Sequence, residues 1–294
     1  MDTYEFAWEA AAAGDLDSLI QMYELGYPHE WTSFDSACQA AMNGHLNCLV
    51  WLHKTYGSSI HNLIDISAKS GHLNCLKYSH ENGYRFTSKT SLKAASGGHL
   101  DCLRYLHENG CEWNSSATLA AAENGHLDCL IYLHENGCEW NDSITSVAAE
   151  NGHFDCLRFA HENGCKLGST LHAAKGGNLD CLRYLVENGC VLTVDATFWA
   201  AAQGHFFCLQ YLHQKGCPWD KETTLAAARN GNLDCLRYAI ENGCPIYQED
   251  EDELTLWKME QLKKDIEKSR TVLLNSLDYR ISNDIAKYII TLFI

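Results

Sequence analysis

Cysteine and histidine recur along this sequence at spacings that could hold a metal ion. One block contains His99, Cys102, His107 and Cys111, and the next block repeats the pattern at His126, Cys129, His134 and Cys138. Thiolate sulfur and imidazole nitrogen are the usual ligands of a tetrahedral zinc ion. Each block would therefore form a zinc site if its four side chains converged.

Helical geometry argues against convergence. On an α-helix Cys102 and His107 point about 140° apart, and His99 and His107 are separated by about 12 Å along the axis. Asn178 and Asn232 also replace the first histidine in later blocks. We therefore expect no cofactor. A zinc-binding repeat protein is the less favoured alternative, which elemental analysis would test.

The cysteines obey two positional rules. Eight stand before a leucine, at Cys48, Cys75, Cys102, Cys129, Cys156, Cys181, Cys208 and Cys235, and six follow a glycine, at Cys111, Cys138, Cys165, Cys190, Cys217 and Cys244. Only Cys38 lies outside both sets. Reactive thiols need exposure and a positive neighbourhood, whereas the Cys-Leu set lies beside an apolar stripe. We predict small buried core residues.

Charge and hydropathy limit the function classes. The formal net charge of -16 would repel a phosphate backbone, so we expect no nucleic-acid partner. The sequence contains no run of 18 or more apolar residues that could span a membrane. Met1 to Ala13 has no basic region of the kind that begins a secretion signal. We expect a cytoplasmic protein in a reducing compartment, and the sequence indicates no oligomeric state.

A short motif that begins with glycine organises the chain. It occurs nine times, at Gly14, Gly44, Gly71, Gly98, Gly125, Gly152, Gly177, Gly204 and Gly231, mostly 27 residues apart. In one copy, the helix formers of Ala117–Glu123 stop at Asn124-Gly125, and Leu127–Glu135 then carries a helical apolar stripe. These units predict an all-α repeat solenoid of about nine helix-turn-helix units, spanning residues 1–247 and followed by a helical C-terminal extension.

The segment Ala120 to Cys138, AAAENGHLDCLIYLHENGC, is similar to the second half of the ankyrin repeat. The units are about six residues shorter than the family's 33, and the family's Thr-Pro-Leu-His start is absent. The missing residues would build the projecting finger of the family's repeat. The variant resembles arrays encoded by amoebae, related protists and giant DNA viruses, which implies host cytoplasm if the chain is viral.

The resemblance implies a non-enzymatic scaffold that binds a protein partner through the concave face of its first helices. The residues just before each motif glycine correspond to the family's variable contact positions, and our candidates are Lys69, Ser70, Ser96, Glu123, Asn124, Glu150, Asn151, Lys175, Gln203, Arg229 and Asn230. Repetition also argues against catalysis, because an active site needs a unique constellation. Solvated helix ends are the alternative for each of these positions.

Three tryptophans, Trp113, Trp140 and Trp219, each follow a Gly-Cys pair by two residues. A row of tryptophans could form a binding hot spot. We favour packing between adjacent connectors.

Residues 248–294 depart from the repeat. They open with the acidic run Glu249 to Glu253, and the last segment, Leu277 onward, faintly resembles the start of an F-box, without its usual Leu-Pro. That resemblance implies a ubiquitin-ligase adaptor whose Ile285 and Ile289 contact the ligase. A hydrophobic cap on the last repeat is the favoured alternative.

Overall fold

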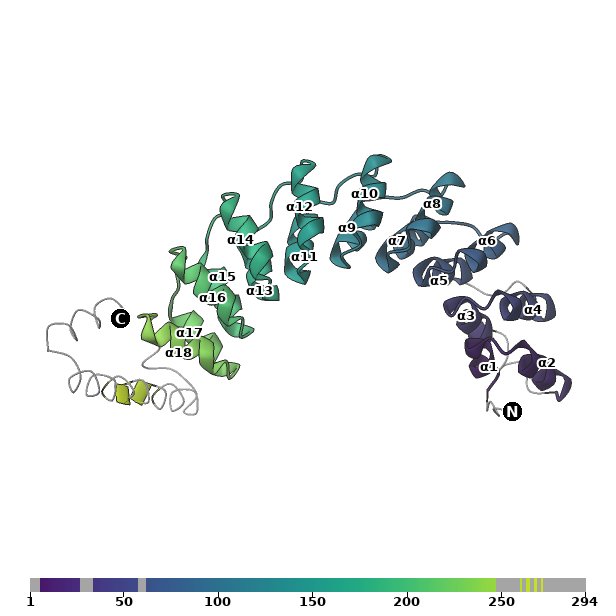
Figure 1. The fold of residues 1–294 in the computed structure, drawn as a ribbon. Coiled ribbons are helices and arrows are strands. Elements are labelled where there is room, and N and C mark those ends of the chain that lie inside the picture. The colour runs from purple at the N-terminus through teal and green to yellow at the C-terminus, as the bar shows by residue number, and fades with distance from the viewer. Residues whose placement is uncertain are drawn as a thin grey trace, which may run out of the picture. The chain divides into compact units, whose positions relative to one another are not determined.

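In the computed structural model, the structure describes residues 6–26, 34–57 and 62–246, together with residues 260, 263, 264, 267, 268 and 271. Within these residues every regular element is a helix (Figure 1). The helices are α1 (Ala7–Ala13), α2 (Leu16–Glu24), α3 (Phe34–Met42), α4 (Leu46–Tyr56), α5 (Leu63–Ser70), α6 (Leu73–Glu81), α7 (Ser88–Gly97), α8 (Leu100–Glu108), α9 (Ser115–Glu123), α10 (Leu127–Glu135), α11 (Ile144–Asn151), α12 (Phe154–Glu162), α13 (Thr170–Gly176), α14 (Leu179–Glu187), α15 (Val194–Ala202), α16 (Phe206–Gln214), α17 (Lys221–Arg229) and α18 (Leu233–Glu241). The described helices confirm an all-α helical repeat.

We call the odd-numbered helices A helices and the even-numbered ones B helices, since each repeat holds one of each. The chain forms two compact units. The first extends to Ala148 and includes Asp155–Lys166, and the second comprises Ala149–Phe154 and the chain from Leu167 onward. In the first unit α3, α5, α7 and α9 contact one another in succession, and in the second unit α13, α15 and α17 do so.

Glycine ends both helices of a repeat. In α7, the N–H of His99 donates to Ala94 O and that of Gly98 to Ala95 O, at 3.0 and 3.2 Å. This Schellman pattern needs a left-handed residue, and Gly98 has a φ of 74°. The chain therefore reverses after a few residues, so that the two helices of one repeat pack side by side.

Small and aliphatic side chains form the core. Ala94, Ala95 and Ala121 of the A helices are fully buried, as are Leu130 and Leu133 of the B helix α10. Alanine allows neighbouring A helices to approach closely, while leucine fills the wider space around the B helices. A single helix pair would leave these faces in water, so each repeat depends on its neighbours.

Four kinds of hydrogen bond recur along the repeats, and two of them involve the connectors. The Thr118 hydroxyl donates to Glu139 O of the following connector at 3.1 Å. The Cys138 thiol donates to Asn114 O of the preceding connector at 3.3 Å. A third bond runs between B helices, where His107 Nδ1 lies 3.0 Å from the Tyr132 hydroxyl.

The fourth kind joins the motif of one repeat to the end of the A helix of the preceding repeat. His126 Nε2 lies 3.1 Å from Ser96 O, and His205 Nε2 lies 3.0 Å from Lys175 O. Because a carbonyl only accepts, each of these imidazoles donates from Nε2. We call this contact the clamp, and it fixes the A-helix ends that carry the candidate residues.

Candidate partner-binding surface

All eleven candidate residues lie at the C-terminal ends of A helices or immediately after them. Half-buried are Ser70, Ser96, Glu150 and Lys175, and exposed are Lys69, Glu123, Asn124, Asn151, Gln203, Arg229 and Asn230. Since neighbouring A helices contact one another within each unit, these ends form one row per unit. Asn124 Nδ2 and Ser96 Oγ, 3.4 Å apart, illustrate this adjacency in the first unit.

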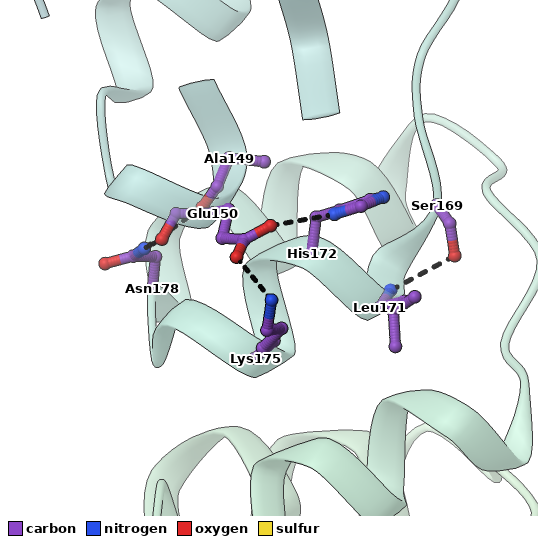
Figure 2. A network of polar contacts seen from close by, with 7 residues as sticks. All are labelled: Ala149, Glu150, Ser169, Leu171, His172, Lys175 and Asn178. Atoms are coloured by element: carbon purple, nitrogen blue, oxygen red, sulfur yellow. Dashed lines mark hydrogen bonds and ion pairs between the residues drawn. The ribbon is translucent and has the colours of Figure 1, made fainter. Parts of the chain in front are cut away.

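In the second unit the row carries a network of ionisable side chains (Figure 2). Glu150 of α11 accepts a hydrogen bond from Lys175 Nζ at 2.7 Å, and its other carboxylate oxygen lies 3.0 Å from His172 Nδ1. His172 and Lys175 are one turn apart on α13, so both reach the same carboxylate. A carboxylate held by two partners is fixed in position more firmly than an isolated surface charge.

The electrostatics of Glu150 follow from this geometry. Hydrogen bonds from Lys175 and then His172 lower the pKa of the Glu150 carboxyl, against the smaller opposing effect of burial. About a third of the side chain is exposed, at 31%. The network is therefore accessible to a partner.

Two aromatic residues extend the network along α15. Lys175 Nζ lies 5.4 Å from the centre of the Trp199 ring, within the range of a cation–π contact. Phe198 meets Trp199 edge to face, with the ring centroids 5.4 Å apart. Glu150, Lys175 and Trp199 thus lie in sequence across three consecutive A helices.

The sequence-based candidates missed His172, Phe198 and Trp199. His172 and Trp199 occupy the position five residues before the motif glycines Gly177 and Gly204. That position lies one helical turn before the predicted ones and so on the same face. The helical spacing, applied to each repeat, would have identified His172 and Trp199.

The histidines and cysteines of the repeat are engaged in packing. Cys102 and Cys129 are buried, and burial raises the pKa of each thiol to about 12. Cys38, Cys165 and Cys190 are half-buried, and every other cysteine is buried. In the part of the chain that the structure describes, no three His, Cys, Asp or Glu side chains converge as metal ligands would.

The three tryptophans pack, but their contacts differ from the prediction. Trp113 lies on the His107 ring of its own repeat, with centroids 4.0 Å apart, and meets Tyr132 of the next repeat edge to face. The expectation of packing between adjacent connectors is therefore wrong for Trp113. It holds in part for Trp140, whose Nε1–H donates to Asn163 O, directly after α12, at 3.3 Å. The histidine at the end of the B helix offers a flat ring at the height of the connector, which the sequence pattern did not reveal.

Ile285 and Ile289 lie outside the described residues, as does the acidic run from Glu249 to Glu253. No described helix has both the length and the apolar character needed to cross a bilayer.

These repeats define a helical solenoid, and comparison with known proteins identifies its family. The model for ankyrin repeats in three copies matches residues 37–117 and again residues 118–197, which together cover more than half of the chain. The chain therefore belongs to the ankyrin repeat family. Ankyrin repeats are generally modules of protein–protein interaction, and the family is typically non-enzymatic.

Among solved structures, the crystal structure of the human ASB11 ankyrin repeat domain is similar to this chain. The identity is 21%, the match covers 60% of this chain and 96% of that chain, and the TM-score is 0.49. No curated protein matches the sequence.

Proposed function

We propose that this protein is a non-enzymatic scaffold that binds a protein partner through the concave helical face of its repeats, which the A helices form. The observation that carries the proposal is the Glu150–Lys175–Trp199 row, which places an anion, a cation and an aromatic ring on three consecutive A helices. The repeated Cys, His and Thr residues are already engaged in the contacts that hold the repeats together. This row uses positions that vary between repeats, where a solenoid can differ without losing its core.

The chemistry of the row suits protein recognition. Tryptophan is enriched among residues that dominate binding energy, and here it lies beside charged groups that can pair with a partner. In the first unit the same helix-end positions hold Lys69, Ser96 and Glu123. Because the side chains differ from repeat to repeat, a partner would be recognised by a sequence of contacts rather than by one site.

Site-specific photocrosslinking would test the proposal. A photoreactive amino acid placed at Gln203, an exposed residue after α15, should form a crosslinked product with a partner in extract of the natural host. The matched control places it at Asp180, whose side chain is 83% exposed on the B helix α14. We expect the product from position 203 and not from 180.

A variant completes the test. Trp199→Ala should abolish the product from position 203 while the far-ultraviolet circular dichroism stays unchanged. Equal products from both positions, or a product that survives the variant, would show that the partner binds elsewhere.

The sequence of residues 277–294 supports a second proposal, a substrate-recruiting adaptor of a ubiquitin ligase. Its observation is the faint F-box resemblance, with Ile285 and Ile289 as ligase contacts. A pull-down with the purified adaptor protein that F-box motifs bind would test it. Binding that is lost in Ile285→Asp with Ile289→Asp supports this role, and no binding to the full chain overturns it.

A further inference from the structure

A small depression lies on the second unit between α15 and α17. Its lining residues are Val194, Asp195, Phe198, Trp199, Asp220 and Glu222, and its volume is about 260 Å³. Pockets for drug-sized ligands measure roughly 300–1,000 Å³. The depression therefore suits a single side chain better than a whole metabolite.

Its lining combines aromatic rings with acids and contains no basic residue. The ring planes of Trp199 and Phe198 stand at 88° to each other, so that the edge of one ring meets the face of the other. Asp195 lies in the first turn of α15, and Asp220 caps the start of α17, where its Oδ1 accepts from the Glu222 N–H at 3.0 Å. Lys221 is exposed and is not among the lining residues.

The Trp199 ring already receives one cation, since Lys175 Nζ lies 5.4 Å from its centre. Glu150 holds the same ammonium at 2.7 Å. The charge of Lys175, which lies over the Trp199 ring, is thus balanced by Glu150. The depression itself is lined by three carboxylates, those of Asp195, Asp220 and Glu222. A positively charged guest is favoured there by both the ring faces and the acids.

The geometry also distinguishes between kinds of cation. Among the described residues no group of His, Cys, Asp and Glu converges tightly enough to hold a metal ion. A guanidinium is planar, stacks on aromatic faces and donates several spread hydrogen bonds to carboxylates, whereas an ammonium is a compact, strongly hydrated charge. Dispersed carboxylates around an aromatic pair match a guanidinium better than an ammonium.

We propose that the depression between α15 and α17 binds an arginine side chain of the protein partner. The proposal rests on the proposed scaffold function and names one contact of that interaction. Trp199 and Phe198 provide the stacking surface, and Asp195 and Glu222 accept hydrogen bonds from the guanidinium.

A peptide titration of the full-length chain tests this assignment. The probe is a capped nonapeptide of glycine and serine with one central arginine, and its matched controls carry glutamine, lysine or trimethyl-lysine there. The readout is the indole ¹⁵N–¹H signal of Trp199, assigned with Trp199→Phe. We expect saturable shifts with the arginine peptide, and affinity for it that falls about fivefold or more in Asp195→Asn and in Glu222→Gln.

Asp180→Asn is the control variant, since it removes one negative charge from a B helix and should leave the arginine affinity unchanged. Circular dichroism confirms that each variant folds. Tighter binding of the lysine or trimethyl-lysine peptide overturns the choice of guanidinium. Absence of binding by every peptide, while the crosslink at position 203 still forms, overturns the pocket assignment and leaves the scaffold function standing.

Discussion

His126 donates from Nε2 to the carbonyl oxygen of Ser96 across 3.1 Å, and this contact joins residues 30 positions apart in the chain. Asparagine forms the same clamp elsewhere: Asn178 Nδ2 donates to Ala149 O and Glu150 O at 3.0 and 2.7 Å. Two different side chains thus satisfy the carbonyls at the end of an A helix. The requirement is a donor at this place, and the ring itself is dispensable.

We therefore predict that His126→Asn is nearly neutral and His126→Ala is not. The alanine variant leaves helix-end carbonyls without their donor and should lower the free energy of unfolding by about 1–2 kcal/mol. The asparagine variant should stay within about 0.5 kcal/mol of wild type. Urea denaturation followed by circular dichroism measures both, and equal losses would contradict the donor requirement.

Gly98 and Gly110 offer a second test, because their φ angles of 74° and 79° are similar and their surroundings differ. A Cβ at Gly98 would clash with His126 Nδ1, whereas at Gly110 nothing lies within 4 Å of it. Gly110→Ala should cost only the left-handed strain, about 1–2 kcal/mol. Gly98→Ala should cost a further ~1–3 kcal/mol through overpacking against the clamp. Urea denaturation would contradict this account if the two variants were equally stable.

The Glu150 network predicts a pH dependence of stability. Its carboxyl pKa is lowered in the folded chain from an ordinary value of 4.5, so the folded state favours the ionised form. The stabilisation is therefore complete above the unfolded pKa and is lost as the pH falls through the folded value.

Urea midpoints of wild type and Glu150→Gln should differ at pH 7 and converge as the pH falls below 4.5 and through the lowered pKa of the Glu150 carboxyl. Glu123→Gln, at the corresponding exposed position of the preceding repeat, serves as the control. A difference between wild type and Glu150→Gln that does not depend on pH would show that the ion pairs contribute nothing.

Thiol labelling provides a fourth prediction. Burial raises the pKa of Cys102 and Cys129 to about 12, so at pH 8 almost no thiolate is present and neither sulfur is accessible. Cys165 and Cys190 are half-buried. Mass spectrometry of the native protein treated with iodoacetamide should find label first at the half-buried Cys38, Cys165 and Cys190, and at Cys102 only after unfolding. Labelling of Cys102 at equal rates with and without urea would contradict the predicted burial.

The sequence predicted the helices well because their ends carry strong local signals. Leu127–Glu135 was predicted with the bounds that α10 has, since Gly125 and Asn136-Gly137 enclose it. Helix α9 begins two residues earlier than predicted, at Ser115, because the Asn114 side chain accepts from the Ser116 N–H and caps it there. The local sequence thus contains the signal for the ends of α10 and for the start of α9. The prediction for α9 did not take the Asn114 cap into account.

The contacts across repeats were less predictable. That Trp113 lies on His107 depends on where the connector places the indole, which no spacing within one repeat specifies. The Glu150–Lys175 pair likewise joins residues 25 positions apart and exists only because neighbouring A helices stack. The row of candidate positions was foreseeable, whereas the partners within it required the structure.

The clamp has a consequence for the number of repeats that the chain can hold. Each motif supplies its donor to the A helix of the preceding repeat, and the A helix of its own repeat receives the donor of the following motif. One 27-residue block can therefore follow another without leaving a helix-end carbonyl unpaired. Deletion or duplication of a whole block is expected to leave each clamp donor beside a helix-end carbonyl and to yield a folded chain. The number of repeats, and with it the length of the row of A-helix ends, can therefore change without disturbing the contacts that hold one repeat to the next.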